Sequence, residues 1–454
     1  MRVLLLNPPA KGGQSRDGRC QTEGSAWLSS FPPTTLAGIA GCVRERHQIK
    51  LMDCIGSAMG YYEAMAQALE YEPDFVVVNT STQTLEADLE IAGRIRDTTG
   101  AKIIAYGESV TARRAELVAD GSVDFAVLGE PETPVMKILG GSPSVTGVAF
   151  RGWDGGLWSE PDLDTLPFPA YDLLPVYLYP LTGERWMFVR TGRGCPYKCV
   201  FCIQPSYSNK PRVHSVDYIV RQLKWLRGLG INVFMFWEET ATLNRPHVLG
   251  MCDRFVREGL DKSCKWFATT RVDRFDDELA EAMSKAGCRM LAFGIESGCQ
   301  EILDVNGKGI TLEESKSAVS SARRHGIVTV GHFIIGLPGD TPKRARQTVK
   351  FACDLKLDFA QFYVATPFLG SEFHKIASDN GWIVEADTRN IQQGIAAVSY
   401  PDFSADQMQA ERRRAFMKFY LRPHAIYASL KARSMQSILR LPLQALAFSR
   451  WALK

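Results

Sequence analysis

The pattern that most limits the fold is an alternation of short, nearly continuous apolar segments with longer amphipathic ones. It fills the N-terminal third of the chain, and apolar strands that alternate with helices are typical of a parallel sheet covered on both faces. Residues 1–145 are therefore predicted to form an α/β domain with a doubly wound parallel sheet. Strands are expected at 3–7, 48–53, 75–80, 102–106 and 125–129, and helices at 35–46, 64–70, 85–98 and 113–120.

The same alternation resumes in residues 185–380, where six further strands predict a partial, open (β/α)6 barrel of the TIM type. Barrel enzymes place their sites at the carboxyl ends of the strands, so the polar residues after each strand are the candidate site residues. The expected strands are 187–191, 232–237, 265–270, 289–295, 328–335 and 358–365.

A hairpin and a linker are expected between the two domains, at residues 146–184. Apolar runs at 147–151 and 156–160 flank Trp153-Asp154-Gly155, and an Asp-Gly pair between such runs is typical of a hairpin turn. The Pro-rich stretch 161–171 that follows is predicted to be extended.

The C-terminal region, 381–454, is predicted to be helical and basic. Residues 411–454 carry ten Lys or Arg against one acidic residue, whereas the rest of the chain has 43 basic and 49 acidic residues. Two interpretations are open: a solvated face, and a peripheral contact with an anionic membrane surface. Nucleic acid is not expected, because the basic residues are not interleaved with exposed aromatics. Helices are expected at 408–421, with Arg412, Arg413, Arg414 and Lys418, and at 425–431 and 437–453.

Composition favours a cytoplasmic protein. The chain of 454 residues contains no run of eighteen apolar residues, which predicts no membrane-spanning helix. Its first residues are predicted to be a strand rather than a signal peptide. The eleven cysteines are odd in number and mostly scattered through apolar segments, a pattern that favours a reducing compartment over a disulfide framework.

Three of the cysteines, Cys195, Cys199 and Cys202, form a C-x3-C-x2-C run after the first expected strand of the barrel. Thiolates at this spacing can hold one compact metal centre, but three are one short of the four that close a structural zinc site or an ordinary cubane. A [4Fe–4S] cluster with three cysteine ligands keeps one iron open for a small molecule. The alternatives are a zinc site with a distant fourth ligand and three incidental cysteines.

The run resembles the signature of the radical S-adenosylmethionine (SAM) superfamily, which also has a Gly-x-Gly lead-in, here Gly192 to Gly194, and an aromatic residue before the last cysteine, here Phe201. The resemblance implies that the cluster binds SAM through its open iron. The reduced cluster would then split SAM into methionine and a 5′-deoxyadenosyl radical. It also implies an electron donor such as flavodoxin or ferredoxin.

Later strand ends match the same superfamily in order. The resemblance implies that Glu238 and Glu239 contact the SAM amino group, Glu296 the ribose hydroxyls, and Gly336 with its neighbours the adenine. For each glutamate a purely structural role is the alternative. Arg271 could bind the SAM carboxylate or equally pair with Asp273. The polar residues expected nearest a substrate, and the guesses for catalytic residues, are Tyr363 and His332.

The N-terminal domain resembles the cobalamin-binding domain of many radical SAM proteins, through Asn7-Pro8-Pro9, the segment 32–38 and the segment 123–132. No G-x-G-x-x-G follows the first strand, which argues against a dinucleotide. A D-x-H-x-x-G motif is absent, and Tyr106-Gly107-Glu108-Ser109 stands where Gly-Gly-Pro-His is usual. The alternative is a domain that only packs against the catalytic one. Corrin contacts are expected at the strand ends, from Asn7, Asp53, Thr80, Ser81, Gly107, Glu108, Gly129 and Glu130.

Together these resemblances imply a cobalamin-dependent radical SAM enzyme, a family that includes methyltransferases and the anaerobic cyclase that builds a porphyrin ring. The predicted function is methylation of an unactivated carbon in a small-molecule, lipid or tetrapyrrole-type substrate. One alternative is oxidative cyclisation or hydroxylation without methyl transfer. Another, from a different class, is a non-catalytic protein that senses cobalamin or an Fe–S cluster.

Overall fold

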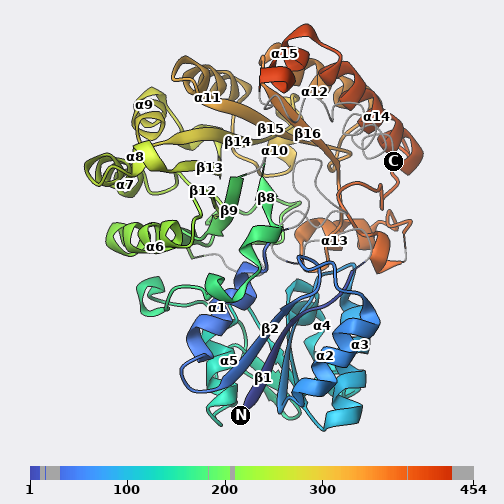
Figure 1. The fold of residues 1–454 in the computed structure, drawn as a ribbon. Helices are drawn as coiled ribbons and strands as arrows, with labels where there is room; N and C mark the ends of the chain where they lie inside the picture. The colour runs from blue at the N-terminus through green and yellow to red at the C-terminus, as the bar shows by residue number, and fades with distance from the viewer. Residues whose placement is uncertain (11–15, 17–30, 182–183, 205–209, 386, 432–454) are drawn as a thin grey trace. The chain divides into compact units, whose positions relative to one another are not determined.

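The structure is a computed structural model that describes residues 1–10, 16, 31–181, 184–204, 210–385 and 387–431. Its elements gather into two compact units (Figure 1). The first unit contains residues 1–180 together with the short segment 206–212, and the second contains 181–205 together with 213–454. The segment that follows the cysteine run thus returns to the N-terminal unit before the chain continues into the second.

The first unit is built on a seven-stranded sheet with the order β2-β1-β3-β4-β5-β6-β7. The first five strands in this order are parallel, and β6 and β7 are antiparallel additions at one edge. The strands are β1 (Arg2–Asn7), β2 (Gln48–Asp53), β3 (Phe75–Asn79), β4 (Lys102–Tyr106), β5 (Phe125–Val127), β6 (Val148–Phe150) and β7 (Trp153–Asp154). The helices are α1 (Thr34–Val43), α2 (Tyr61–Tyr71), α3 (Leu85–Thr99), α4 (Glu108–Ala119) and α5 (Glu132–Leu139).

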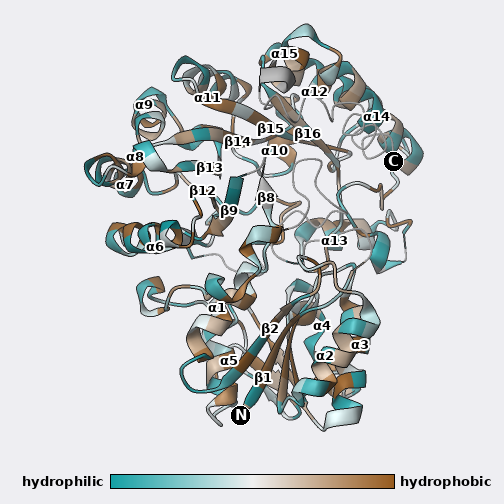
Figure 2. Cartoon of the chain, in the orientation of Figure 1, coloured by the Kyte–Doolittle hydropathy of each residue, from teal (hydrophilic) through white to brown (hydrophobic). Residues whose placement is uncertain are grey.

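Both faces of this sheet are covered, because alternate residues of each strand point to opposite sides. In β1, Leu4 and Leu6 pack in a cluster with residues of α2, α3 and α4, whereas Val3 and Leu5 pack with residues of α1 and α5. The strands of the unit are correspondingly apolar in Figure 2. The predicted α/β class and doubly wound sheet are therefore confirmed, and strand order reverses between β1 and β3, where such sheets bind ligands.

The hairpin is present, but its turn lies earlier than the sequence predicted. Phe150 of β6 is opposite Trp153 of β7, so the two turn residues are Arg151 and Gly152, and Gly152 has a φ of +83°. Asp154 was expected in the turn. Its carboxylate instead accepts hydrogen bonds from the Gly156 N–H and from the Arg114 side chain. Short 3₁₀ turns follow at Leu163–Thr165, Tyr171–Leu173 and Val176–Leu178.

The second unit is a parallel half-barrel with the strand order β16-β15-β14-β13-β12-β9-β8. From β9 to β16 all neighbouring pairs are parallel, as the predicted (β/α)6 barrel requires. Its strands are β8 (Pro180–Leu181), β9 (Glu184–Val189), β12 (Val233–Phe236), β13 (Lys265–Thr270), β14 (Cys288–Glu296), β15 (Val328–Ile335) and β16 (Phe359–Val364). A separate two-stranded sheet consists of β10 (Gly192–Arg193) and β11 (Arg212–Val213).

Helices follow the barrel strands in sequence (Figure 1). They are α6 (Val216–Gly228), α7 (Arg245–Arg257), α8 (Leu260–Ser263), α9 (Asp277–Lys285), α10 (Gln300–Val305), α11 (Leu312–Arg324), α12 (Pro342–Asp354), α13 (Glu372–Asp379), α14 (Ala405–Tyr420) and α15 (Pro423–Lys431), with 3₁₀ turns at Val272–Arg274 and Thr388–Asn390. In β15 and β16 buried residues such as Phe333 and Phe362 alternate with half-buried ones, and the ring of Phe362 contacts Phe416 and Phe419 of α14. The half-buried residues therefore lie on the face turned away from α14.

Helix α14 also provides hydrogen-bond partners for backbone carbonyls of β16, the strand at the edge of the half-barrel. Arg412 donates from Nε to the Phe362 carbonyl over 3.0 Å, and the Tyr420 hydroxyl donates to the Ala360 carbonyl over 2.8 Å. Burial lowers the pKa of Arg412 to about 10. Arg412 is thus part of the core, and the expectation that it lies on a basic surface face of the tail is wrong. Edge strands need such cover, because their unpaired backbone groups invite other chains.

The predicted helices at 408–421 and 425–431 are present as α14 and α15, whereas the one predicted at 437–453 lies outside the described residues, which end at Lys431. Within the described part of the chain, no helix combines the length and the apolar character that crossing a membrane requires.

Candidate active site

The three cysteines lie in the loop that follows β9 and the short strand β10. Cys199 is buried, with 8% of its surface exposed, and Cys195 and Cys202 are half-buried, all with free thiols. The Cys202 N–H donates to the Cys199 carbonyl over 3.0 Å. The next residue after Cys199, Val200, donates its N–H to the Asn306 carbonyl over 3.0 Å. The loop is therefore held by the rest of the protein directly after its buried cysteine.

The donor set of this loop suits a cluster rather than a single ion. A structural zinc site is closed by four protein ligands, whereas a cubane binds each thiolate through a different iron and can keep one iron open. Three thiols within eight residues therefore suit a [4Fe–4S] cluster.

Tyr197, midway between Cys195 and Cys199, contacts two arginines that follow β13. The guanidinium carbon of Arg271 lies 3.6 Å from the centre of its ring, and Arg274 donates from Nε to its hydroxyl over 2.6 Å. Arg271 also pairs with Asp273 over 2.8 Å. The sequence left two roles open for Arg271, binding of the SAM carboxylate and pairing with Asp273. The contacts seen here are those of the second role.

Glu296, at the end of β14, is paired with a residue that the sequence did not single out. Its carboxylate accepts a hydrogen bond of 2.8 Å from the Lys308 ammonium, and both side chains are almost fully buried. Glu296 has a φ of +67°, and a β-bulge between Gly294 and Glu296 interrupts the pairing with β15. Strained backbone of this kind concentrates at functional sites.

Gly294 makes the room for this ion pair, because a Cβ there would lie 2.8 Å from a Glu296 oxygen. Lys308 and Arg271 are also close enough to Cys199 to act on it electrostatically. Burial raises the pKa of the Cys199 thiol, and the two positive charges oppose that rise.

The paired glutamates after β12 have separate partners. The Thr191 hydroxyl donates to Glu238 over 2.6 Å, and the Gln204 side-chain amide donates to Glu239 over 3.1 Å. Because Thr191 precedes and Gln204 follows the cysteine run, both carboxylates are tied to the segments on either side of it. Phe201 is half-buried within the run itself.

Gly336, after β15, has its backbone fixed from several directions. Its N–H donates to Asp340 over 2.8 Å, and its carbonyl accepts from the Tyr400 hydroxyl over 2.6 Å. Its φ is +84°, and a Cβ there would collide with Met408, so only glycine suits the position. Burial raises the pKa of Asp340 to about 6, although two backbone N–H groups oppose the rise.

His332 and Tyr363 lie side by side on β15 and β16. Their rings are nearly parallel, at 14°, and His332 Nδ1 is 3.0 Å from the Tyr363 hydroxyl. Both are half-buried positions that alternate with the buried ones facing α14. The structure therefore brings the two sequence-predicted substrate residues together.

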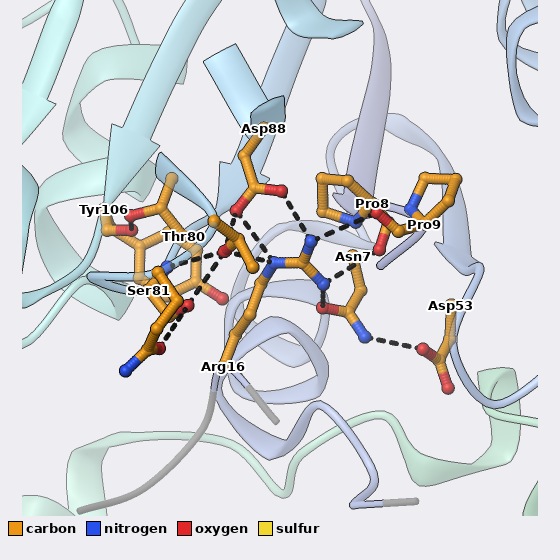
Figure 3. A network of polar contacts seen from close by, with 11 residues as sticks. Asn7, Pro8, Pro9, Arg16, Asp53, Thr80, Ser81, Asp88 and Tyr106 are labelled. Carbon is orange, nitrogen blue, oxygen red and sulfur yellow. Dashed lines mark hydrogen bonds and ion pairs between the residues drawn. The ribbon is translucent and has the colours of Figure 1, made fainter. Parts of the chain in front are cut away.

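In the first unit, a buried network spans the carboxyl ends of β1 and β3, the point where strand order reverses (Figure 3). Arg16 is at its centre and donates to both oxygens of Asp88, over 2.8 and 2.5 Å. It also donates to the Pro8 carbonyl over 2.8 Å and to the Asn7 side chain over 3.4 Å. Thr84 binds the same Asp88 carboxylate over 2.5 Å.

The network continues to the end of β2. The Asn7 amide donates to Asp53 over 2.6 Å, and Asp53 also accepts a hydrogen bond from the Tyr179 hydroxyl. Burial raises the pKa of Asp53, against the effect of these donors. A Cβ at Gly56 would collide with both Asp53 and Tyr179. Asn7 and Asp53, predicted as corrin contacts, are thus engaged by the protein's own side chains.

The predicted residues after β3 and β4 contact each other. The Thr80 hydroxyl donates to the Tyr106 carbonyl over 2.8 Å, and Gly107, with a φ of +144°, has no room for a Cβ beside Thr80. Ser81 is buried and 2.8 Å from the Thr84 hydroxyl. Glu108 begins α4.

After β5, Gly129 lies so close to the Trp158 backbone that a Cβ would collide with it. Glu130 is bound in two-pronged fashion by Arg212, over 2.6 and 3.1 Å, with only 5% of the Glu130 side chain exposed. Arg212 belongs to the segment 206–212 that returns to this unit. Glu130, predicted as a corrin contact, thus pairs with Arg212.

A half-barrel with a three-cysteine loop after its first strand, and matching polar residues at its later strand ends, defines a radical SAM enzyme. The model of the radical SAM superfamily matches residues 189–352. An uncharacterised methyltransferase of Pyrococcus horikoshii is 30% identical over 442 residues, covering 94% of each chain. The chain belongs to the radical SAM superfamily, whose cofactors are a [4Fe–4S] cluster and SAM. This membership makes it an enzyme and argues against the sensing alternative.

Two further proteins are similar over most of the chain. The anaerobic magnesium-protoporphyrin IX monomethyl ester cyclase of Cereibacter sphaeroides is 25% identical, over 81% of this chain and 62% of its own length. The radical SAM methyltransferase TsrM of Kitasatospora setae, solved with cobalamin and a [4Fe–4S] cluster, superposes with a TM-score of 0.69 at 16% identity. That superposition covers 93% of this chain and 89% of TsrM, so the fold of both units is shared.

Four residues that organise these sites were missed from the sequence: Arg16, Asp88, Arg212 and Lys308. Three of them act over long separations, from 72 to 82 residues, and no local pattern marks such a pair. Lys308 had a weak signal, because it is a lysine between two glycines, Gly307 and Gly309, shortly after the Glu296 motif.

Proposed function

We propose that this enzyme methylates an unactivated carbon of a small-molecule, lipid or tetrapyrrole-type substrate, with cobalamin bound by its first unit. The observation that carries the proposal is the pairing of a doubly wound N-terminal unit with a cysteine-loop half-barrel in one chain. TsrM has the same pairing and holds cobalamin and a cluster, and the relative from P. horikoshii is named a methyltransferase.

Cys195, Cys199 and Cys202 would hold the cluster through their thiolates. When bound, the cluster, SAM and cobalamin supply the radical chemistry and the methyl group, while the protein supplies binding, orientation and exclusion of water. A buried Cys199 and two half-buried partners suit this task, because they keep solvent from one side of the cluster.

SAM would be bound by groups at the carboxyl ends of the barrel strands. Glu238 and Glu239 would accept from its amino group, and Glu296 from its ribose hydroxyls. The fixed backbone of Gly336 would lie against the adenine, beside Phe201. Charge-assisted hydrogen bonds of this kind are stronger than neutral ones, and Glu296 is already held in place by Lys308.

The corrin would lie beyond the carboxyl ends of the first unit's strands. Thr80, Gly107, Glu108 and Gly129 would approach it there, whereas Asn7, Asp53, Ser81 and Glu130 would act mainly by shaping that edge. The unit's one histidine, His47, precedes β2 at the opposite edge, so no histidine of this unit would ligate the cobalt from below.

His332 and Tyr363 are proposed to face the substrate. Hydrogen-bonded to each other, they can move a proton between the imidazole and the phenol without a net change in charge. Such a pair could take up or return the proton that a substrate loses or gains during the reaction.

Oxidative cyclisation or hydroxylation is the second candidate, and similarity to the magnesium-protoporphyrin cyclase over 81% of this chain favours it. An electron donor such as flavodoxin or ferredoxin is proposed for either reaction. Contact of the basic C-terminal region with an anionic membrane is a further proposal.

One experiment tests the function. Anaerobic protein, reconstituted with iron, sulfide and cobalamin, is incubated with a reductant, methyl-deuterated SAM and host extract, and the products are followed by mass spectrometry. Methylation gives a product that carries deuterium from the labelled methyl group. A product without label, formed together with 5′-deoxyadenosine, supports the second candidate. Protein that retains no corrin refutes the cobalamin-dependent proposal.

A further inference from the structure

The loop that carries the cysteines is fixed at its midpoint through the side chain of Tyr197. One face of its ring stacks on Arg271, at 3.6 Å from the guanidinium carbon, and its hydroxyl accepts from Arg274 over 2.6 Å. Tyr197 has one cysteine two residues before it and another two residues after it. Holding Tyr197 therefore holds the turn that Cys195 and Cys199 flank.

Arg271 can serve as a rigid support because its own plane is set by three contacts. Its Nε donates to Asp273 over 2.8 Å, its Nη2 donates to the Lys308 carbonyl over 2.7 Å, and its face carries the tyrosine ring. A guanidinium binds through its edges and stacks through its face, so these contacts do not compete. Arg271 is buried, which strengthens all three.

A second contact holds the loop on the other side of Cys199. The carbonyl of Asn306 accepts from the Val200 N–H over 3.0 Å, and the Asn306 amide is tied to the Pro338 carbonyl over 3.0 Å. Arg271 contacts the same segment, because it donates to the carbonyl of Lys308, two residues after Asn306. The loop is thus held at Tyr197, before the buried Cys199, and at Val200, after it.

We propose that Arg271 is a positioning residue for the cluster-binding loop, acting through the ring of Tyr197, and that it does not bind the carboxylate of SAM. A bidentate carboxylate needs two parallel N–H donors, and both Nε and Nη2 of Arg271 are committed to Asp273 and to the Lys308 and Gly309 carbonyls. The proposal rests on the proposed assignment of the cluster to Cys195, Cys199 and Cys202.

Contacts that fix this loop matter because they pre-organise the cysteine thiolates for binding the cluster. Thiolates that already stand at their binding positions lose less conformational freedom when they bind, and the centre is held more firmly. Arg271 also places a positive charge against Tyr197, which is two residues from Cys199. Positive charge favours the more negative, reduced state of a cluster, so its removal makes the reduction potential more negative.

The test compares full-length variants that are purified anaerobically and reconstituted with iron and sulfide. Tyr197→Leu and Arg271→Leu should each lose iron to a chelator about tenfold faster than the unchanged protein. Tyr197→Phe keeps the ring face and should stay within about threefold, because it loses only the hydroxyl contacts. Arg257→Leu, at an exposed arginine of α7, is the matched control and should leave iron loss unchanged.

Two further measurements separate positioning from SAM binding and from general damage. The dissociation constant for SAM, per cluster-loaded chain, should be unchanged in Arg271→Leu, and its cluster potential, from a spin-resonance titration, should become more negative. The double variant Tyr197→Leu/Arg271→Leu should lose iron no faster than either single variant, because the two residues act through one contact.

Unchanged iron retention with weakened SAM binding in Arg271→Leu would overturn the proposal and return Arg271 to the SAM site. Additive losses in the double variant would also overturn it. If Arg271→Leu does not fold, Tyr197→Leu, at a half-buried position, decides the question through iron loss alone. Failure of the cluster assignment itself is a separate result: the triple Cys→Ala variant would then retain iron.

Discussion

The buried ion pair between Arg16 and Asp88 makes a strong quantitative prediction. Both side chains are fully buried, and they share two hydrogen bonds, of 2.8 and 2.5 Å. Asp88→Ala removes one partner and leaves a buried guanidinium without its counter-charge, a change that typically costs about 3–5 kcal/mol. Arg16→Met should also destabilise the unit, because it leaves the Asp88 carboxylate buried without its counter-charge.

Hydrogen exchange measured by mass spectrometry suits this prediction, because it reports on the first unit separately from the second. Peptides from β1 and α3 should lose protection by roughly two to four orders of magnitude in each single variant, whereas peptides from β15 should be unchanged. The double variant Arg16→Met/Asp88→Leu should recover much of the loss, since it contains no unpaired charge. Single variants with losses below about 1 kcal/mol, or a double variant whose loss equals their sum, would refute the reasoning.

Four further predictions concern the second unit. Replacing Cys195, Cys199 and Cys202 together by Ala should abolish iron binding and the brown colour of the anaerobic protein; a full cubane iron load in that variant would contradict the assignment. Glu296→Ala should weaken SAM binding about ten- to a hundredfold while the cluster stays intact, because a charged hydrogen bond contributes about 1.5–3 kcal/mol; an equal dissociation constant would remove Glu296 from the site. The pKa of Asp340 is raised to about 6, so the folded state holds this proton more tightly than the unfolded state. The contribution of Asp340 to stability is therefore fully present below about pH 4 and falls by about 3 kcal/mol as pH rises to 6 and beyond. Asp340→Asn should remove this slope in denaturation measured from pH 4 to 7, and a slope identical to that of the unchanged protein would exclude Asp340 as its source. If the C-terminal region binds anionic membranes, the protein should sediment with acidic liposomes, less so with added salt, and truncation before Glu411 should abolish this; sedimentation that salt does not affect would argue against an electrostatic contact.

Much of the fold could be predicted because it depends on local apolar patterns. β13 and β15 have the predicted bounds, since each is an apolar run that ends at a polar or glycine-rich turn. The hairpin turn was misplaced because two glycine-containing turns, Arg151-Gly152 and Asp154-Gly155, lie three residues apart. Sequence alone does not show which glycine has the positive φ that strand pairing uses.

For the candidate site too, local features could be predicted from the sequence and long-range contacts could not. The residues proposed to carry chemistry could be selected from the sequence, because their types and spacing are local. Their supports could not be found, because contacts such as that of Arg271 with Tyr197 or Lys308 with Glu296 depend on how separate loops meet. For Arg271 the sequence offered two roles of equal weight, and the tyrosine ring that the structure places against it was the missing observation.

The return of residues 206–212 to the first unit affects how the protein can be made. Glu130 lies in a buried position whose counter-ion, Arg212, is 82 residues further along the chain. A fragment that ends at residue 180 would lack Arg212, the cation that pairs with this buried carboxylate, so a single cut there would not give the complete first unit. On the ribosome, N-terminal domains usually fold first. Here the N-terminal unit cannot be completed until the cysteine run has been translated as well.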